Sequence, residues 1–252
     1  MTRACAFCGK NNVTKEHLFA KWVRDAYQDK AQSAVEYARD ESVLWTYEGD
    51  ALEQNVKAFC KDCNNGWMSA LEVRTAQVMR PMLRAEQVPV KMGYVAQTIV
   101  ASWATKTAMV LDQMHPADHR IPVSYYRDFH RKREPSSDVL VILGARHKAE
   151  DGKRRANVFE YKAQFVGTDG SGFQHIHFAV GAVYLGVLIK INFQRKVAEL
   201  RLSEDLGKCF ELIWPICAPE VVWPRPSISE FGGVDGVFEA LTHAIPGQLS
   251  VS

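Results

Sequence analysis

The residues best suited to chemistry lie near the start of the chain, where four cysteines form two pairs. Two residues separate Cys5 from Cys8, and two separate Cys60 from Cys63. One such pair alone could be two buried thiols or a redox pair, but two pairs supply the four thiolates of a tetrahedral zinc site. Four thiolates leave no open coordination position, so we expect this zinc to hold the fold and to take no part in a reaction.

A second group of polar residues surrounds the cysteine pairs. A T-K-E-H sequence ending at His17 lies between them, Asn55 precedes the second pair by five residues, and Asn64 directly follows it. This order of motifs resembles the zinc-scaffolded HNH endonucleases, in particular the subset whose last motif letter is asparagine. The resemblance covers about residues 3–72, less than a third of the chain.

The resemblance implies metal-dependent hydrolysis of phosphodiester bonds. Such cleavage needs a water deprotonated near neutral pH and positive charge beside the phosphate, which a histidine and a divalent ion supply. The resemblance makes His17 the general base and Asn55 a residue that orients its imidazole or loop. Asn64, with Asn65 as its competitor, would begin the helix and face the catalytic ion. Glu16 is the expected carboxylate ligand of that ion, Mg²⁺ or Mn²⁺, which is a separate site from the zinc.

Two features depart from the family pattern. The position three residues after His17, commonly proline in the family, is Ala20, and the gap from His17 to Asn55 is longer than in compact members. An insertion of helical character over about residues 20–37 is expected to fill the gap. Asn55 could instead cap a turn. These departures leave open a non-catalytic zinc-ribbon protein that binds nucleic acid or a protein partner.

Positive charge is local. The formal net charge is only +2, so no overall field draws the chain to nucleic acid. Residues 120–155 carry ten basic and five acidic residues, and their most basic part is Arg131, Lys132 and Arg133. We expect these three residues, with Lys15 beside the histidine motif, to contact the phosphates of nucleic acid, DNA in preference to RNA. A merely solvated loop is the alternative.

Length and composition are those of an ordinary folded protein. The chain has 252 residues, of which 47% are hydrophobic and 24% charged, which excludes disordered and fibrous classes. The first residues lack the apolar core of an export signal, and the longest apolar run, residues 178–189, is too short to span a membrane. Paired cysteines without export favour metal over disulfides, so we expect a cytoplasmic protein with no membrane partner.

The remainder of the chain predicts helices followed by strands. Apolar residues recur at helical spacing from Trp67 to Met82 and over residues 92–113, and a short helix is expected at 125–132. Runs of β-branched and aromatic residues predict six strands, at residues 139–143, 158–165, 173–180, 184–192, 197–202 and 210–213. Their short connections imply an antiparallel sheet. A last helix is expected near residues 234–243.

Two further sets of candidate ligands are interpreted as structural. His175 and His177 share one face of a predicted strand, and no cysteine or carboxylate lies near them in the sequence. We therefore expect an exposed polar strand face there, with a pair of metal ligands as the alternative. Cys209 and Cys217 lie among strand residues and are expected to be buried apolar thiols.

These patterns together predict an α+β fold of two domains. Residues 1–72 would form a small zinc-stapled HNH (ββα-metal) module, because so short and polar a segment takes its order from a metal. Residues 73–252 would hold helices over 73–132, a β-rich part over 137–215 and the last helix, and would provide substrate selection or homodimer contacts. A restriction, phage-related or defence role is compatible with such a nuclease, and the sequence selects none of them.

Overall fold

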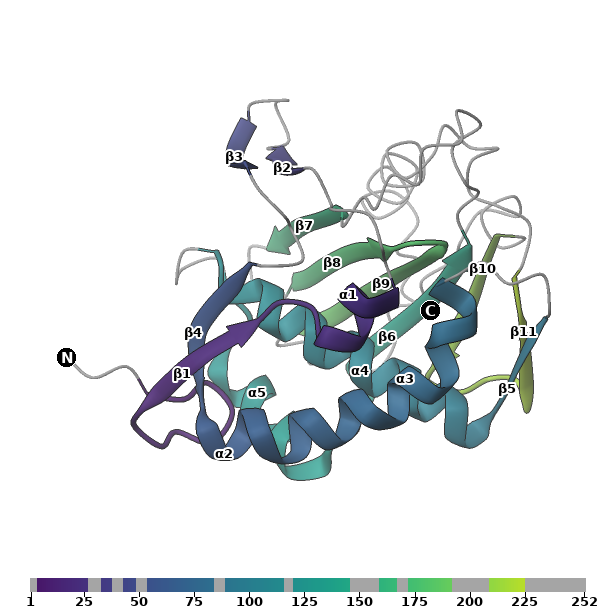
Figure 1. The fold of residues 1–252 in the computed structure, drawn as a ribbon, viewed down its shortest axis with the longest axis horizontal. Coiled ribbons are helices and arrows are strands. Elements are labelled where there is room, and N and C mark those ends of the chain that lie inside the picture. The colour runs from purple at the N-terminus through teal and green to yellow at the C-terminus, as the bar shows by residue number, and fades with distance from the viewer. Residues whose placement is uncertain are drawn as a thin grey trace.

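The computed structural model describes residues 4–26, 33–37, 43–48, 54–83, 89–115, 120–145, 159–166, 172–191 and 209–224. This part of the chain mixes helices with antiparallel sheets (Figure 1). The predicted α+β class is therefore confirmed. The strand predicted at 197–202 and the helix predicted near 234–243 lie outside the described residues.

The first structural unit is a pair of strands followed by a helix. Strands β1 (Val13–His17) and β4 (Asn55–Cys60) pair antiparallel, so that Val13 lies opposite Cys60 and His17 opposite Asn55. The chain then enters three consecutive helical segments, α2 (Lys61–Cys63), η2 (Asn64–Met68) and α3 (Ser69–Leu83). Gly66 interrupts the helical path, with φ −92° and ψ −109°. The kink redirects α3 away from the cysteine end of the strand pair.

The segment between β1 and β4 is partly helical and partly extended. Helix α1 (Lys21–Ala26) agrees with the predicted helical insertion. The prediction is wrong for its last part, because residues 33–37 form β2 (Ser33–Tyr37), paired antiparallel with β3 (Val43–Glu48). Strand β3 is rich in β-branched and aromatic residues. Pairing with such a strand stabilises an extended partner more than local helix propensity opposes it.

A buried helix and a five-stranded sheet form the centre of the molecule. Helix α4 (Tyr94–Asp112) contacts α3 on one side and four strands of the sheet on the other (Figure 1). The strands lie in the order β10 (Phe210–Trp214), β6 (Val139–Ala145), β9 (Val183–Ile191), β8 (Gly172–Val180) and β7 (Phe159–Val166). These agree with five predicted strands to within two residues at each end. No helix among the described residues is long and apolar enough to cross a membrane.

Two smaller elements complete the described fold. Helix α5 (Val123–Lys132) lies close to its predicted position. Strand β5 (Val90–Gly93), which lies in a region predicted as helical, pairs with β11 (Glu220–Trp223). That pairing joins the start of α4 to the end of the described chain. Strand β5 could not be predicted from its own sequence because its partner strand lies far away in the chain.

Most of the buried apolar residues that the structure describes form one cluster that spans the fold. It runs from Phe7 and Phe59 at the strand pair, through Trp103 on α4, to Phe178 on the sheet. The boundary predicted at residue 72 falls inside α3. The division of the chain into two separately folding domains therefore stays a prediction.

The histidines of β8 are buried, so the expectation of an exposed strand face is wrong. His175 is 3% exposed and His177 is fully buried. Their imidazoles meet at 2.9 Å, Nε2 of His177 to Nδ1 of His175, and the Tyr184 hydroxyl meets Nδ1 of His177. Burial lowers the pKa of His175 to about 3, which keeps its ring neutral. Every residue of β8 is buried, so these imidazoles and the Tyr184 hydroxyl have one another as hydrogen-bond partners in place of water.

Candidate functional site

The four predicted cysteines come together in one cluster. The Sγ atoms of Cys5, Cys8, Cys60 and Cys63 all lie within 4.8 Å of one another, and Cys8 and Cys60 are 3.4 Å apart. A tetrahedral zinc ion with zinc–sulfur bonds of about 2.3 Å separates its thiolates by roughly 3.8 Å. The cluster therefore could hold a structural metal such as zinc. Among the described residues, no other group of three or more His, Cys, Asp or Glu side chains is placed to do so.

A tight turn and an aromatic cluster support the cysteine site. The Gly9 amide donates to the Cys5 carbonyl at 2.8 Å, and Gly9 has a φ of +76°, which favours glycine. Within this turn, Phe7 stacks on Phe59 with ring centroids 4.8 Å apart and meets the edge of Trp67 at 4.9 Å. The turn that carries Cys5 and Cys8 is thus held against an aromatic cluster.

The remaining cysteines differ from each other. Cys209 is buried, as predicted, whereas Cys217 is exposed in the turn between β10 and β11. The expectation for Cys217 is wrong because the apolar neighbours that suggested a strand end before it. Neither residue belongs to the four-cysteine cluster.

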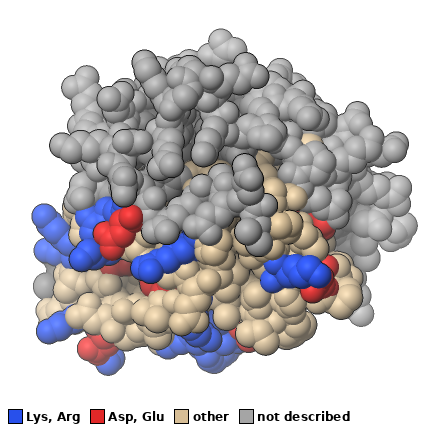
Figure 2. Space-filling model, turned by 45° about the vertical axis from the view of Figure 1, so that its right-hand side comes forward, with Lys and Arg blue, Asp and Glu red and all other residues tan. Residues whose placement is uncertain are grey.

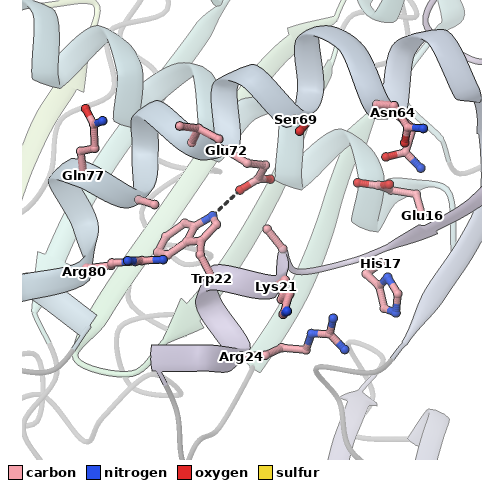
Figure 3. A pocket seen from close by; sticks show the side chains of 14 residues that line it. Glu16, His17, Lys21, Trp22, Arg24, Asn64, Ser69, Glu72, Gln77 and Arg80 are labelled. Carbon is pink, nitrogen blue, oxygen red and sulfur yellow. Dashed lines mark hydrogen bonds between the residues drawn. The ribbon is translucent and has the colours of Figure 1, made fainter.

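A cavity of about 540 Å³ opens between β1, α1 and the helices that follow the second cysteine pair. Three of the predicted site residues line it together: Glu16, His17 and Asn64. Asn65 lines it as well. Glu16 and His17 come from the end of β1, and Asn64 begins η2, so the fold joins residues that are far apart in the sequence (Figure 3).

Glu16 is the most perturbed ionisable group of the cavity. Burial raises the pKa of its carboxyl to about 7. The charge of Lys106 and a hydrogen bond from Asn64 oppose this rise, while the nearby charge of Glu72 adds to it. Near neutral pH the carboxyl is therefore close to its midpoint, and a positive charge placed beside it would favour the ionised form.

Asn64 connects the start of the helices to the first strand. Its side-chain Nδ2 donates to the Lys15 carbonyl at 3.3 Å. Figure 3 shows Glu16 directed toward Asn64. An amide and a carboxylate from two different elements thus meet on one side of the cavity.

His17 and Asn55 lie at the open end of the strand pair. They are opposite each other in the register, and both are exposed. A backbone hydrogen bond of 3.0 Å from Leu18 to Gln54 continues the pairing beyond them. In Figure 3 the His17 ring turns away from Glu16 and toward Arg24. His17 lines the cavity, whereas Asn55, on the neighbouring strand, does not.

Glu72, to which no sequence motif pointed, is a part-buried hub of the cavity wall. Its Oε2 accepts hydrogen bonds from the indole nitrogens of Trp22 at 2.6 Å and Trp103 at 2.7 Å, and its Oε1 pairs with Nζ of Lys106. Lys106 is only 1% exposed. A lysine in the middle of an otherwise apolar helical run was the available signal, because a buried ammonium needs a carboxylate partner.

The predicted basic residues of α5 lie away from the cavity. Arg131 and Lys132 both pair with Asp128, at 2.5 and 3.0 Å. Arg133 lies over the Trp67 ring at 4.4 Å from its centroid, and burial lowers the pKa of its guanidinium. Lys15 is exposed on β1. None of the four lines the cavity.

Other cations line the cavity instead. They are Lys21 and Arg24 from α1 and Arg80 from α3. On the described surface seen in Figure 2, Lys and Arg side chains lie in several separate patches with acidic side chains beside some of them. The positive charge of the cavity therefore comes from these three lining cations, and the surface seen in Figure 2 shows no single broad basic face.

Comparison with protein-family models, with curated proteins and with solved structures found no match to this chain. The residues and their geometry alone therefore carry the argument about function.

Proposed function

We propose that this protein is a metal-dependent endonuclease of the zinc-scaffolded HNH type that hydrolyses phosphodiester bonds in DNA. One observation carries the proposal. Glu16, His17 and Asn64, which the family motif requires together, line a single cavity, and the strand pair that leads to it carries a four-cysteine cluster at its other end. A chance combination of common motif letters would not predict this convergence of one strand and one helical segment.

In the proposed reaction His17 takes a proton from the attacking water. Its ring is exposed at the cavity, where a water and a phosphate can reach it. Asn55, opposite it in the strand register, would hold the end of β1 and so orient the ring. The leaving oxygen must gain a proton, which solvent can supply at the open mouth.

The donors of the cavity fit an oxygen-preferring divalent ion. Glu16 offers a carboxylate, and Asn64, whose side-chain amide lies beside that carboxylate, has one amide oxygen to add as a ligand. Together with water and phosphate oxygens, these are the ligands that Mg²⁺ or Mn²⁺ accepts. When bound, the ion would supply positive charge beside the scissile phosphate. The four thiolates, in contrast, fit a closed zinc site.

A non-catalytic zinc-ribbon protein that binds nucleic acid is the second candidate. One observation favours it, because the His17 ring turns toward Arg24 and away from the Glu16–Asn64 side (Figure 3). A cavity used only for binding would require no alignment between base and ion site. This candidate predicts binding without cleavage.

The test is cleavage of supercoiled plasmid by the purified full chain with Mg²⁺ or Mn²⁺. We expect nicked or linear products that disappear with EDTA and with Glu16→Gln, an isosteric change that removes the carboxylate charge. Bound zinc must be measured in every sample, so that loss of the scaffold is not mistaken for loss of the catalytic ion. If the zinc-loaded wild type cuts neither plasmid nor RNA with either ion, the proposal is contradicted. That result would favour the non-catalytic zinc-ribbon protein.

A further inference from the structure

We propose that Lys21 and Arg24 of α1 hold the phosphate backbone of the nucleic acid at the cavity, in place of the basic residues of α5. This inference rests on the proposed function, which makes nucleic acid the ligand of the cavity. It adds which residues bind the nucleic acid and that they do so through its phosphates.

Helix α1 presents its two cations on one face. Trp22 and Val23 are 7% and 0% exposed, so one side of the helix is buried in the fold. Lys21 and Arg24 are three residues apart and therefore share the other side. Both line the cavity, and Figure 3 shows them on the side that also carries His17.

The helix is anchored in a way that fixes these cations relative to the cavity. The Trp22 indole donates to the part-buried Glu72 at 2.6 Å, and its ring packs on Trp103 at a centroid distance of 5.6 Å. Phe19, just before the helix, is fully buried. A binding residue held by a rigid element loses less conformational entropy when it contacts its ligand.

The charges that line the cavity favour an anion. Its cations are Lys21, Arg24 and Arg80, and its carboxylates are Glu16 and Glu72. The charge of Glu72 is already matched by buried Lys106. The remaining balance is positive, which raises the local concentration of a polyanion such as a nucleic-acid backbone.

The basic residues of α5 are placed for a different role. Arg131 and Lys132 share the carboxylate of Asp128, which offsets part of their charge. Arg133 packs on Trp67 beside the cysteine cluster. These contacts stabilise the end of the helix. The cations of α1, in contrast, line the same cavity as His17, the proposed general base.

The cavity offers phosphate contacts and no platform for stacking bases. Trp22 is the aromatic residue among the side chains that line it, apart from the imidazole of His17, and its indole is buried against Glu72. Exposed aromatic rings normally hold single-stranded bases. We therefore expect binding that depends steeply on salt and weakly on base sequence.

The test compares two variants that each remove two positive charges, Lys21→Gln/Arg24→Gln and Arg131→Gln/Lys132→Gln. Each full-length protein is titrated onto a short fluorescein-labelled DNA duplex over a range of salt concentrations, with Ca²⁺ in place of Mg²⁺ to limit cleavage. We expect the α1 variant to bind roughly 10- to 100-fold more weakly, with the slope of log affinity against log salt smaller by about 2. The α5 variant should bind like the wild type.

Lys21→Gln alone keeps the test decisive if the double variant folds poorly. Lys21 is exposed, so its loss should leave the fold and the zinc content unchanged and lower the salt slope by about 1. An unchanged slope in both α1 variants, or weaker binding by the α5 variant alone, would overturn the inference. So would a wild type that does not bind DNA.

The inference and the nuclease proposal can fail separately. If the wild type cuts DNA while the α1 variants bind normally, the nuclease proposal stands and this inference falls. If binding depends on Lys21 and Arg24 but no cleavage occurs with Mg²⁺ or Mn²⁺, the inference stands and the cavity belongs to a binding protein.

Discussion

The two ends of the β1–β4 pair are built in opposite ways. At one end, Val13 lies opposite Cys60, and the four thiols are packed within 4.8 Å of one another. At the other end, His17 lies opposite Asn55, both side chains are exposed, and a cavity of about 540 Å³ begins.

Under the proposed function, this strand pair would separate stability from chemistry. The cysteine end is closed, and its contacts can be saturated by one metal ion. The cavity end retains an ionisable carboxyl with a pKa of about 7 and cations that line the cavity wall. We expect changes at the first end to affect folding before activity, and changes at the second to affect activity before folding.

The largest expected effect is at the closed end. Cys60→Ser removes one of the four clustered thiols, and structural zinc sites contribute on the order of 10 kcal/mol to folding. We expect loss of bound zinc and loss of cooperative unfolding of the β1–β4 region, measured by zinc quantification and circular dichroism. Cys217→Ser is the matched control, because that thiol is exposed and outside the cluster. Normal zinc content in Cys60→Ser would break the comparison.

A smaller loss is expected at the hub behind the cavity. Glu72→Ala leaves the Lys106 ammonium buried without its carboxylate, which should destabilise the protein by about 3–5 kcal/mol in urea unfolding. The double change Glu72→Ala/Lys106→Met should recover much of this loss, because no buried charge then lacks a partner. Zinc should remain bound in both proteins. Equal stability of Glu72→Ala and wild type would show that the hub does not hold the cavity wall.

The smallest effect concerns the pH dependence of stability. Because folding raises the Glu16 pKa from 4.5 to about 7, the folded state binds more protons than the unfolded state between these values. The contribution of this group is therefore full below about pH 4.5 and is lost as the pH rises through 7. Glu16→Gln should remove this loss, so that its advantage over wild type grows by about 1–2 kcal/mol from pH 5 to pH 8, allowing for solvent screening. Parallel stability curves for the two proteins would contradict the account of this carboxyl.

Residue type and local spacing were sufficient to predict the closed end. Cysteine pairs identify a metal cluster because few other arrangements use four thiols, and the structure brings all four together. Strands such as β6 and β9 were also predictable, since continuous apolar runs of β-branched residues indicate buried strands.

Features that depend on packing between distant elements could not be predicted. The Glu72–Lys106 pair exists only because α3 packs on α4. The burial of His175 and His177 depends on what covers β8, and the placement of Lys21 at the cavity depends on the anchor of Trp22. Sequence spacing carries no information about such partners, which is why the cations expected in α5 differ from those that line the cavity.

The most direct test of the account is the cleavage rate of His17→Ala relative to wild type, with zinc quantified in both proteins. The account predicts full zinc content, unchanged thermal unfolding and metal-dependent DNA cleavage slower by about 10²- to 10⁴-fold, the contribution of a general base. A zinc-loaded His17→Ala protein that cuts DNA at the wild-type rate would contradict it, because the chemistry would then lie elsewhere than at the open end of the strand pair.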